Sequence, residues 1–282
     1  MPAHRSRTER WRELLEQIAQ RGGGIEITVD RGSSATEEPS TCLMWRVRVY
    51  SVSDDMLTVE QPGAAGRSMT LAEGTPLLGI MSVGQNRWIF RTRVAGVRPG
   101  LVGRSGMLSL VMPEGMERCA RREHIRVSTT ELRLPSVECW PLLEPASVAM
   151  AEAANRERIR SMLHHESSRT DAFLGDMLPE VGPKFTATLV NIGGGGVGLQ
   201  VAKADAAAAG RCRLLWIRLN LTPEIPAPLA LTSKVVHTHL DSAQNLYLGA
   251  AFDFDFNPSH REFVVEQITR YLNLIQSVRR AA

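Results

Sequence analysis

The sequence predicts a mainly β protein with a helix at each end and two β-rich domains between them. Short apolar segments read as strands in two groups, one within residues 43–112 and one within 185–254. Apolar residues at helical spacing precede the first group and follow the second. A length of 282 residues suits two domains of ordinary size.

The first region begins with a predicted helix and continues as strands. Residues 6–9 (SRTE) have the spacing of a capping box, apolar residues follow at helical spacing from Trp11 to Ile18, and the glycines 22–24 end the helix. The predicted strands span 43–50, 56–60, 77–82, 88–97 and 107–112. Because no helix is expected between these strands, they indicate an antiparallel barrel or sandwich.

The second region opens with a basic segment. A Pro- and Gly-containing hinge at 113–117 precedes the arginine segment, residues 118–126, which leads into a strand at Val127. Residues 144–166 predict one helix whose charged residues, among them Glu152, form a solvated face, and a polar loop follows at 167–183. Further strands are predicted at 185–192, 198–201, 213–221, 229–239 and 247–254. Asn257 and Pro258 then open a closing helix that runs to about Ser277.

Charge and composition exclude several classes of function. The chain has 33 Lys and Arg residues against 30 Asp and Glu residues, and a net charge of +3 is too weak a field for bulk DNA binding. No apolar run is long enough for a membrane span, and the N-terminus lacks a secretion signal, so we expect a cytoplasmic protein. The cysteines at 42, 119, 139 and 212 have no metal-ligand spacing and are expected to be free thiols.

Patterns typical of enzymes and metal sites are incomplete. Residues 193–198 (GGGGVG) fit a dinucleotide-binding loop, but such a loop needs a helix directly after Gly198, where the sequence reads as a strand. A calcium loop starting at Asp253 fails at its sixth and twelfth positions, and two histidine clusters, 164–166 and 237–239, lack further ligands. We therefore expect neither an enzyme nor a metal protein, with a nicotinamide or flavin enzyme as a remote alternative.

Two short motifs suggest a family. The arginine segment contains Arg122-x-x-x-Arg126, and a glycine-rich turn begins at Asn191. In this order the motifs resemble the PilZ domain, a six-stranded β-barrel that binds cyclic di-GMP. Residues 87–97 and 108–113 are similar to the flagellar-brake (YcgR-like) group, in which an N-terminal split barrel precedes the PilZ barrel.

The resemblance implies a domain organisation. The N-terminal YcgR-like split barrel with its leading helix would occupy residues 1–116, and the PilZ domain with its C-terminal helix would occupy 117–282. Arg126 and Asn191 are 65 positions apart, more than the family usually has. A helical and loop segment inserted at about 135–183 accounts for the excess, as a partner-binding element or as a flap over the ligand site.

The resemblance also implies a binding site. Arg121, Arg122 and Arg126 would bind guanine edges and phosphates, since a planar guanidinium can bond to guanine O6 and N7 together. The turn would supply Asn191 and the four glycines Gly193, Gly194, Gly195 and Gly196, which allow positive φ and an anion-binding nest. Arg121, just before the motif, implies two stacked nucleotides per chain rather than one. Gly193 departs from the family, which has Ser at that position.

The implied function is that of a non-enzymatic cyclic di-GMP receptor. Ligand binding at the hinge would reorient the two barrels and regulate motility or exopolysaccharide output, with the flagellar motor or another protein effector as partner and no cofactor. The resemblance places such a protein in the cytoplasm or at the flagellar basal body. The alternative is a degenerate PilZ scaffold that binds protein partners without nucleotide, favoured by Asn191, Gly193 and the insertion.

Overall fold

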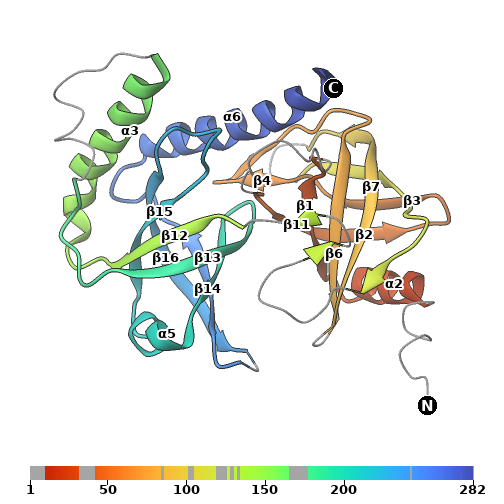
Figure 1. Ribbon diagram of the computed structural model, residues 1–282, viewed down its shortest axis with the longest axis horizontal. Helices are drawn as coiled ribbons and strands as arrows, with labels where there is room; N and C mark the ends of the chain where they lie inside the picture. Colours follow the sequence, from red (N-terminus) through yellow and green to blue (C-terminus); the bar gives the residue numbers. More distant parts are fainter. Residues whose placement is uncertain are drawn as a thin grey trace. The chain divides into compact units, whose positions relative to one another are not determined.

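The chain forms two compact units, and each is described by itself (Figure 1). The computed structural model describes residues 10–31, 42–83, 86–100, 105–118, 126–127, 130–131, 134–164, 177–241 and 243–281. The first unit comprises Met1–Gly63, Ser68–Arg133 and Val278–Ala282, and the second comprises Ala64–Arg67 and Leu134–Ser277.

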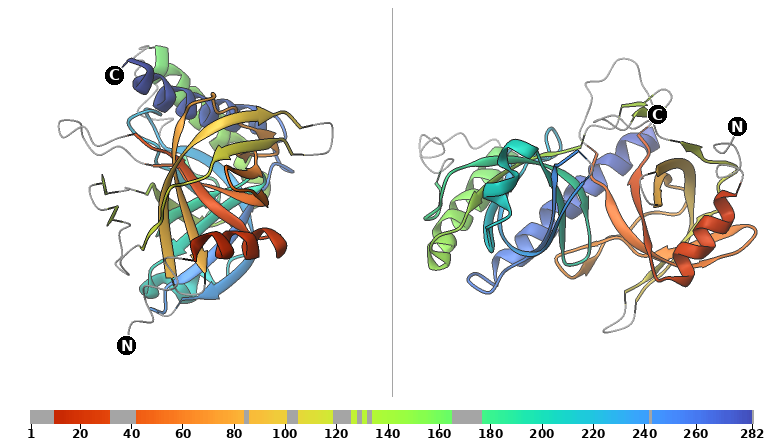
Figure 2. Two further views of the ribbon diagram at one scale, coloured as in Figure 1. Left: turned by 90° about the vertical axis from the view of Figure 1, so that its right-hand side faces the viewer. Right: turned by 90° about the horizontal axis from the view of Figure 1, so that it is seen from below.

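The first unit is a closed ring of six antiparallel strands. In spatial order these are β1 (Gly24–Val29), β6 (Pro76–Val83), β7 (Asn86–Arg98), β8 (Met107–Val111), β3 (Met56–Glu60) and β2 (Trp45–Val52), and β2 pairs with β1 to close the ring. The short strand β9 (Glu117–Arg118) pairs with β7, and β4 (Gly63–Ala64) and β5 (Arg67–Ser68) form a two-stranded sheet. The right-hand view of Figure 2 shows strands of this unit curving into the ring.

Side-chain alternation explains these strands. Along β2, Trp45, Val47 and Val49 are buried while Arg46 and Arg48 are exposed, as a strand with one face on a core requires. Strand β1 was missing from the sequence prediction. Its inward and outward faces are both covered, because Glu26 is buried in an ion pair with Arg87, so β1 lacks a clear exposed face.

The N-terminal helix α2 (Trp11–Gln20) packs against β2. It ends where predicted: Gly22 has a φ of 64°, and the backbone N–H groups of Gly22 and Gly23 bond to the carbonyls of Ala19 and Ile18. The predicted capping box at 6–9 lies outside the described residues.

The second unit is also a closed, six-stranded antiparallel barrel. Its strands in spatial order are β13 (Phe185–Ile192), β12 (Ser136–Pro141), β15 (Leu214–Leu219), β16 (Leu229–Leu240), β17 (Leu246–Phe252) and β14 (Gly196–Val201), and β14 pairs with β13. Helix α5 (Lys203–Ala209) follows β14, and helix α6 (His260–Ala281) follows β17. In the first unit, β10 (Arg126–Val127) pairs with β11 (Thr130–Glu131). The predicted fold, two β-barrels with terminal helices, is confirmed.

Strand β12 corrects the predicted insertion. Residues 136–141 were assigned to an inserted helix and loop, but they form a barrel strand between β13 and β15. Val137 and Cys139 point inward and are buried, while Pro141 ends the strand. The segment is too short to show a clear alternation of apolar and polar residues, and Pro135 and Pro141 at its borders favour a loop over a strand.

The inserted helix is real but is anchored to the barrel. A 3-10 turn, η1 (Pro145–Ser147), leads into helix α3 (Val148–His164), which packs against β16. The Asn155 side chain donates to the carbonyl of Pro228 at 2.8 Å and accepts from the Ala230 N–H at 3.0 Å. Since these bonds satisfy the backbone at the start of β16, α3 is part of the folded unit.

Glu152 does not belong to a solvated face, contrary to the prediction. Its side chain is 1% exposed, and its carboxylate accepts hydrogen bonds from Thr232 Oγ1 at 3.3 Å and Asn257 Nδ2 at 2.8 Å. Burial raises the pKa of the carboxyl to about 7, although the bonds from Asn257 and Thr232 oppose the rise. Helical periodicity gives the face of a charged residue but cannot show that a strand distant in sequence covers it.

The closing helix α6 begins at His260, later than predicted, because the Asn257 carbonyl first accepts the His260 N–H in a turn. Its predicted apolar stripe is buried and consists of Val264, Ile268, Tyr271, Leu272 and Ile275. Cys42, Cys139 and Cys212 are free thiols, as expected, and Cys119 lies outside the described residues. Among the described helices, none is both long and apolar enough to span a membrane.

Candidate functional site

The glycine turn predicted as a ligand site joins β13 to β14 in the second barrel. Asn191 pairs with Gly198 and Ile192 with Val197 just before the turn. The Gly193 N–H donates to the Gly196 carbonyl at 2.8 Å. The Gly195 carbonyl accepts from the Phe252 N–H at 2.9 Å, so hydrogen bonds hold the turn against the end of β17.

The four glycines of the turn have two different roles. A Cβ at Gly194 or Gly195 would meet no atom within 4 Å, and one at Gly193 would lie 4.0 Å from the nearest atom. A Cβ at Gly196 would overlap the carbonyl oxygen of Ala250, so that position needs glycine for close strand packing. Gly193, Gly194 and Gly195 therefore leave space where a side chain would be, while the carbonyls of Gly194 and Gly195 accept hydrogen bonds from the N–H groups of Gly66 and Phe252.

The backbone of the turn differs from the expected anion nest. None of its four glycines has a φ in the left-handed region, whereas a nest alternates right- and left-handed residues. The space at the turn comes from its lack of side chains, not from unusual φ angles.

Asn191 lies at the start of this turn but is not openly presented. Its residue is 5% exposed, and its Oδ1 lies over Gly198 together with the hydroxyl of Tyr247, since a Cβ at Gly198 would overlap both atoms. A guanine edge could therefore reach the carboxamide only if the groups that cover it move. The prediction that Asn191 faces a guanine stays a prediction.

The arginines cannot be placed around the turn. Arg121 and Arg122 lie outside the described residues, and for Arg126 only the backbone is described, in β10 where it pairs with Glu131. The described chain resumes at Leu134, and the carbonyl of the next residue, Pro135, accepts the Leu189 N–H at 2.9 Å. Leu189 precedes Asn191 on β13, so Pro135, nine positions after Arg126, lies beside the strand that carries Asn191. The described ends of the arginine segment, in β9 and β10, belong to the first unit.

The structure excludes the dinucleotide-binding reading of the same glycines. The residues after Gly198 continue β14 to Val201, and a nicotinamide or flavin loop would need a helix there. Within the described residues, no three His, Cys, Asp or Glu side chains come close enough together to hold a metal ion. The geometry of the turn thus fits a ligand that lies against the outside of a barrel.

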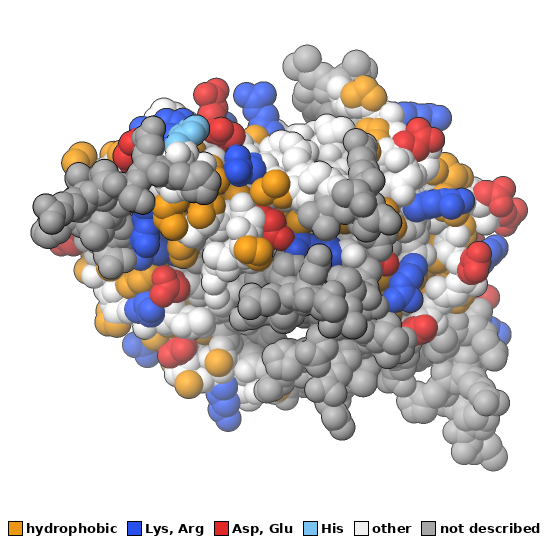
Figure 3. Space-filling model, turned by 45° about the horizontal axis from the view of Figure 1, so that its top comes forward, with side chains coloured by type: hydrophobic (Ala, Val, Ile, Leu, Met, Phe, Trp, Pro, Cys, Tyr) orange, Lys and Arg blue, Asp and Glu red, His pale blue; other side chains and the backbone are white. Residues whose placement is uncertain are grey.

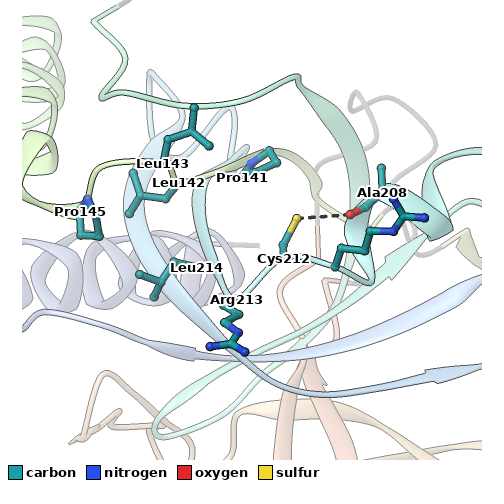
Figure 4. A pocket seen from close by; sticks show the side chains of 9 residues that line it. Pro141, Leu142, Leu143, Pro145, Ala208, Cys212, Arg213 and Leu214 are labelled. Carbon is teal, nitrogen blue, oxygen red and sulfur yellow. Dashed lines mark hydrogen bonds between the residues drawn. The ribbon is translucent and has the colours of Figure 1, made fainter.

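The second unit has a cavity of about 400 Å³ away from the turn. Figure 4 shows apolar side chains of Leu142, Leu143 and Leu214 beside two arginines, and the Cys212 thiol donating to the Ala208 carbonyl at 3.4 Å. Burial raises the pKa of this thiol, which makes it a poor nucleophile. None of the predicted ligand residues lines this cavity.

Charged side chains of both signs are mixed on one face of the molecule (Figure 3). On the face shown in Figure 3, the coloured Lys and Arg side chains lie interspersed with Asp and Glu side chains. A stripe of one sign, which would track a phosphate backbone, is not present on the described part of that face.

Sequence reasoning missed one residue beside the turn. Tyr247 belongs to the segment LYLGAAFDF, where it reads as one alternating residue of a strand. Its position next to Asn191 depends on the pairing of β14 with β17, which sets Gly198 opposite Gly249. The only signal available in the sequence was the glycine at each of these two positions.

The chain thus combines two closed six-stranded barrels with a glycine turn on the second. Solved structures that align with the chain include the Bacillus subtilis inhibitor of motility (MotI/DgrA), at 14% identity over 89% of this chain and 97% of that chain, with a TM-score of 0.29. MrkH of K. pneumonia in complex with c-di-GMP aligns at 13% identity over 100% of this chain and 98% of that chain, with a TM-score of 0.31. YcgR of Escherichia coli in complex with c-di-GMP aligns at 10% identity over 95% and 91% of the two chains, with a TM-score of 0.27.

No family model and no curated protein matches the chain. The function proposed below therefore rests on the residues of this chain.

Proposed function

We propose that this protein is a non-enzymatic PilZ-type receptor for cyclic di-GMP. The observation that carries the proposal is the turn after β13 in a closed six-stranded barrel, where three consecutive residues, Gly193–Gly195, have no side chain and leave space around each Cα. The arginine motif ends 65 positions before Asn191 in the sequence, and the proposal requires the two motifs to meet at this turn.

The chemistry of the two motifs suits the ligand. Cyclic di-GMP carries two phosphates and two guanines, and each guanine offers O6 and N7 to an arginine fork in a bidentate pair of about 1–3 kcal/mol. Arg122 and Arg126 would supply these contacts, and Arg121 would extend them to a second stacked nucleotide. The absence of side chains at Gly193 to Gly195 would let the ligand approach the turn closely.

Binding would also act as a switch. In the chain, the arginine segment follows the hinge at 113–117 and precedes the second barrel, so a ligand that orders the segment would bias the arrangement of the two barrels. The output would be motility or exopolysaccharide production through a protein effector. Small-angle scattering with and without saturating cyclic di-GMP tests the switch, and identical profiles would contradict it.

A second candidate is a scaffold that binds protein partners and no nucleotide. Two observations favour it: Gly193 has no hydroxyl where the family has Ser, and Asn191 is nearly buried. Loss of one hydroxyl contact costs about 0.5–1.5 kcal/mol, which weakens binding without abolishing it. A scaffold that binds no nucleotide therefore requires that the arginines and the rest of the turn do not contact cyclic di-GMP either.

Thermal unfolding distinguishes the two candidates. A receptor with ligand at 100 times its Kd gains about 2.7 kcal/mol of stability, and Arg122→Ala and Arg126→Ala should remove that gain. Arg158→Ala, in an arginine of the inserted helix, is the matched control and should keep it. No stabilisation of the wild-type protein at any ligand concentration would favour the scaffold.

A further inference from the structure

Two glycines on the outer wall of the second barrel are buried beneath aromatic side chains. Gly198 on β14 and Gly249 on β17 are register partners, and the same row continues to Asn191 on β13 and His237 on β16. A Cβ at Gly249 would overlap the His237 ring, and one at Gly198 would overlap the Tyr247 hydroxyl. Both rings therefore lie close against the strand backbones.

Tyr247 sits in a cluster of three π-systems on this wall. Its ring centroid lies 4.7 Å from that of His239, with the planes 31° apart, and 6.0 Å from that of His237, with the planes 24° apart. Both histidines are exposed and Tyr247 is half-buried. The cluster is thus a shallow surface of roughly parallel rings that faces solvent.

A purely structural explanation covers part of this arrangement. Aromatic side chains often cover strand glycines and protect the backbone bonds beneath them. That role needs one ring over each glycine, which Tyr247 and His237 supply. It does not require His239, an exposed third ring at 4.7 Å from Tyr247.

The position of the cluster points to a ligand. The Tyr247 hydroxyl and Asn191 Oδ1 lie over the same glycine, so the rings continue the surface that begins at the predicted ligand turn. Planar bases stack on exposed aromatic side chains whatever their sequence, and such stacking is a large part of nucleotide affinity. We infer that Tyr247, with His237 and His239 beside it, is a stacking surface for one purine base of the bound dinucleotide.

This inference rests on the proposed function and names a residue outside the family's two motifs. The test is calorimetric titration of cyclic di-GMP into the full chain and its variants. Tyr247→Ala should weaken binding about tenfold or more, because stacking on one aromatic ring is lost. Tyr247→Leu should weaken it similarly, since leucine still covers Gly198 but has no π face.

Two conservative variants and one control complete the test. Tyr247→Phe and Tyr247→Trp should bind within about threefold of wild type, because the stacking face is kept. Phe256→Ala removes an exposed aromatic ring elsewhere in the same unit and should leave affinity unchanged. Thermal unfolding of each variant reports whether the barrel is intact.

The outcomes separate the two claims. Wild-type binding together with unchanged affinity in Tyr247→Leu would overturn the stacking surface and leave the receptor standing. A loss in Tyr247→Phe equal to that in Tyr247→Leu would assign the effect to the hydroxyl and would also overturn stacking. Absence of binding by the wild-type protein would overturn both the receptor and its stacking surface.

Discussion

The carboxylate of Glu152, in helix α3, accepts a 2.8 Å hydrogen bond from the side chain of Asn257, which lies between the last barrel strand and helix α6. The same carboxylate accepts a bond from Thr232 on β16. The Thr232 carbonyl accepts a hydrogen bond from the Asp253 N–H. The preceding residue, Phe252, donates its N–H to the Gly195 carbonyl of the glycine turn. A continuous set of hydrogen bonds thus links the inserted helix to the predicted ligand turn.

Removing the Glu152 side chain should destabilise the second barrel. Glu152→Ala removes the acceptor of the buried Thr232 hydroxyl and of the half-buried Asn257 side chain and opens a cavity, at a cost of about 2–4 kcal/mol. Glu152→Gln keeps the size and an acceptor oxygen and should cost less than about 1 kcal/mol. Urea denaturation measures both, and equal stability of the alanine variant and wild type would contradict the account.

The same residue should make stability depend on pH. The pKa of Glu152 is raised by burial to about 7 from an ordinary value of 4.5, so the folded protein holds this proton more tightly than the unfolded chain. The resulting stability is fully present below about pH 4.5 and is lost as the pH rises to about 7. Stability of wild type relative to Glu152→Gln should therefore fall between pH 5 and 7.

Hydrogen exchange of the β16 amides reports the stability of the second barrel alone. Measured at each pH in wild type and in Glu152→Gln, and corrected for the intrinsic exchange rate, it gives the difference in stability between the two proteins. His260 acts in the opposite sense, because burial lowers its pKa to about 4 and its contribution is lost as the pH falls from about 6.5. Wild type and Glu152→Gln both contain His260, so the contribution of His260 to stability cancels when the two are compared. A difference that stays constant or rises with pH would show that Glu152 is ionised throughout.

The two roles of the glycines can be separated by substitution. Gly196→Ala puts a methyl group into the Ala250 carbonyl and should cost about 1–3 kcal/mol of stability, because β14 and β17 must move apart. Gly194→Ala meets no neighbour and should leave stability within about 0.5 kcal/mol of wild type. Thermal unfolding compares them, and equal melting temperatures for the two variants would contradict the close approach of β14 and β17.

Restoring the family's serine should strengthen ligand binding. Gly193 has open space around the position of a Cβ and a φ outside the left-handed region, so Gly193→Ser should fold normally. One added hydroxyl bond of about 0.5–1.5 kcal/mol corresponds to roughly 2- to 12-fold tighter binding. Calorimetry of wild type and variant measures the ratio, with Gly96→Ser, in the first unit at a position with open space, as the control. Weaker binding in Gly193→Ser would place the ligand elsewhere.

Sequence reasoning reached the fold because most strands alternate and their turns contain glycine or proline. Segments such as 56–60 and 185–192 were predicted with the bounds that the structure has. Strands β1 and β12 escaped because one is buried on both faces and the other is short and bordered by prolines.

The site was only partly predictable. A local motif identified the glycine turn, since consecutive residues define it. The neighbours of Asn191 and Glu152 could not be predicted in this way, because Tyr247, Thr232 and Asn257 reach them through strand pairing and helix packing across 56 to 105 positions of sequence.

Titration of cyclic di-GMP into the purified full-length chain tests the central claim most directly. The account predicts saturable binding, with two ligands per chain if Arg121 acts as the resemblance implies. It also predicts that binding is lost in Arg122→Ala and Arg126→Ala, while Arg158→Ala binds as wild type does. Absence of heat and of any stability change in the wild-type protein at millimolar ligand would contradict the receptor.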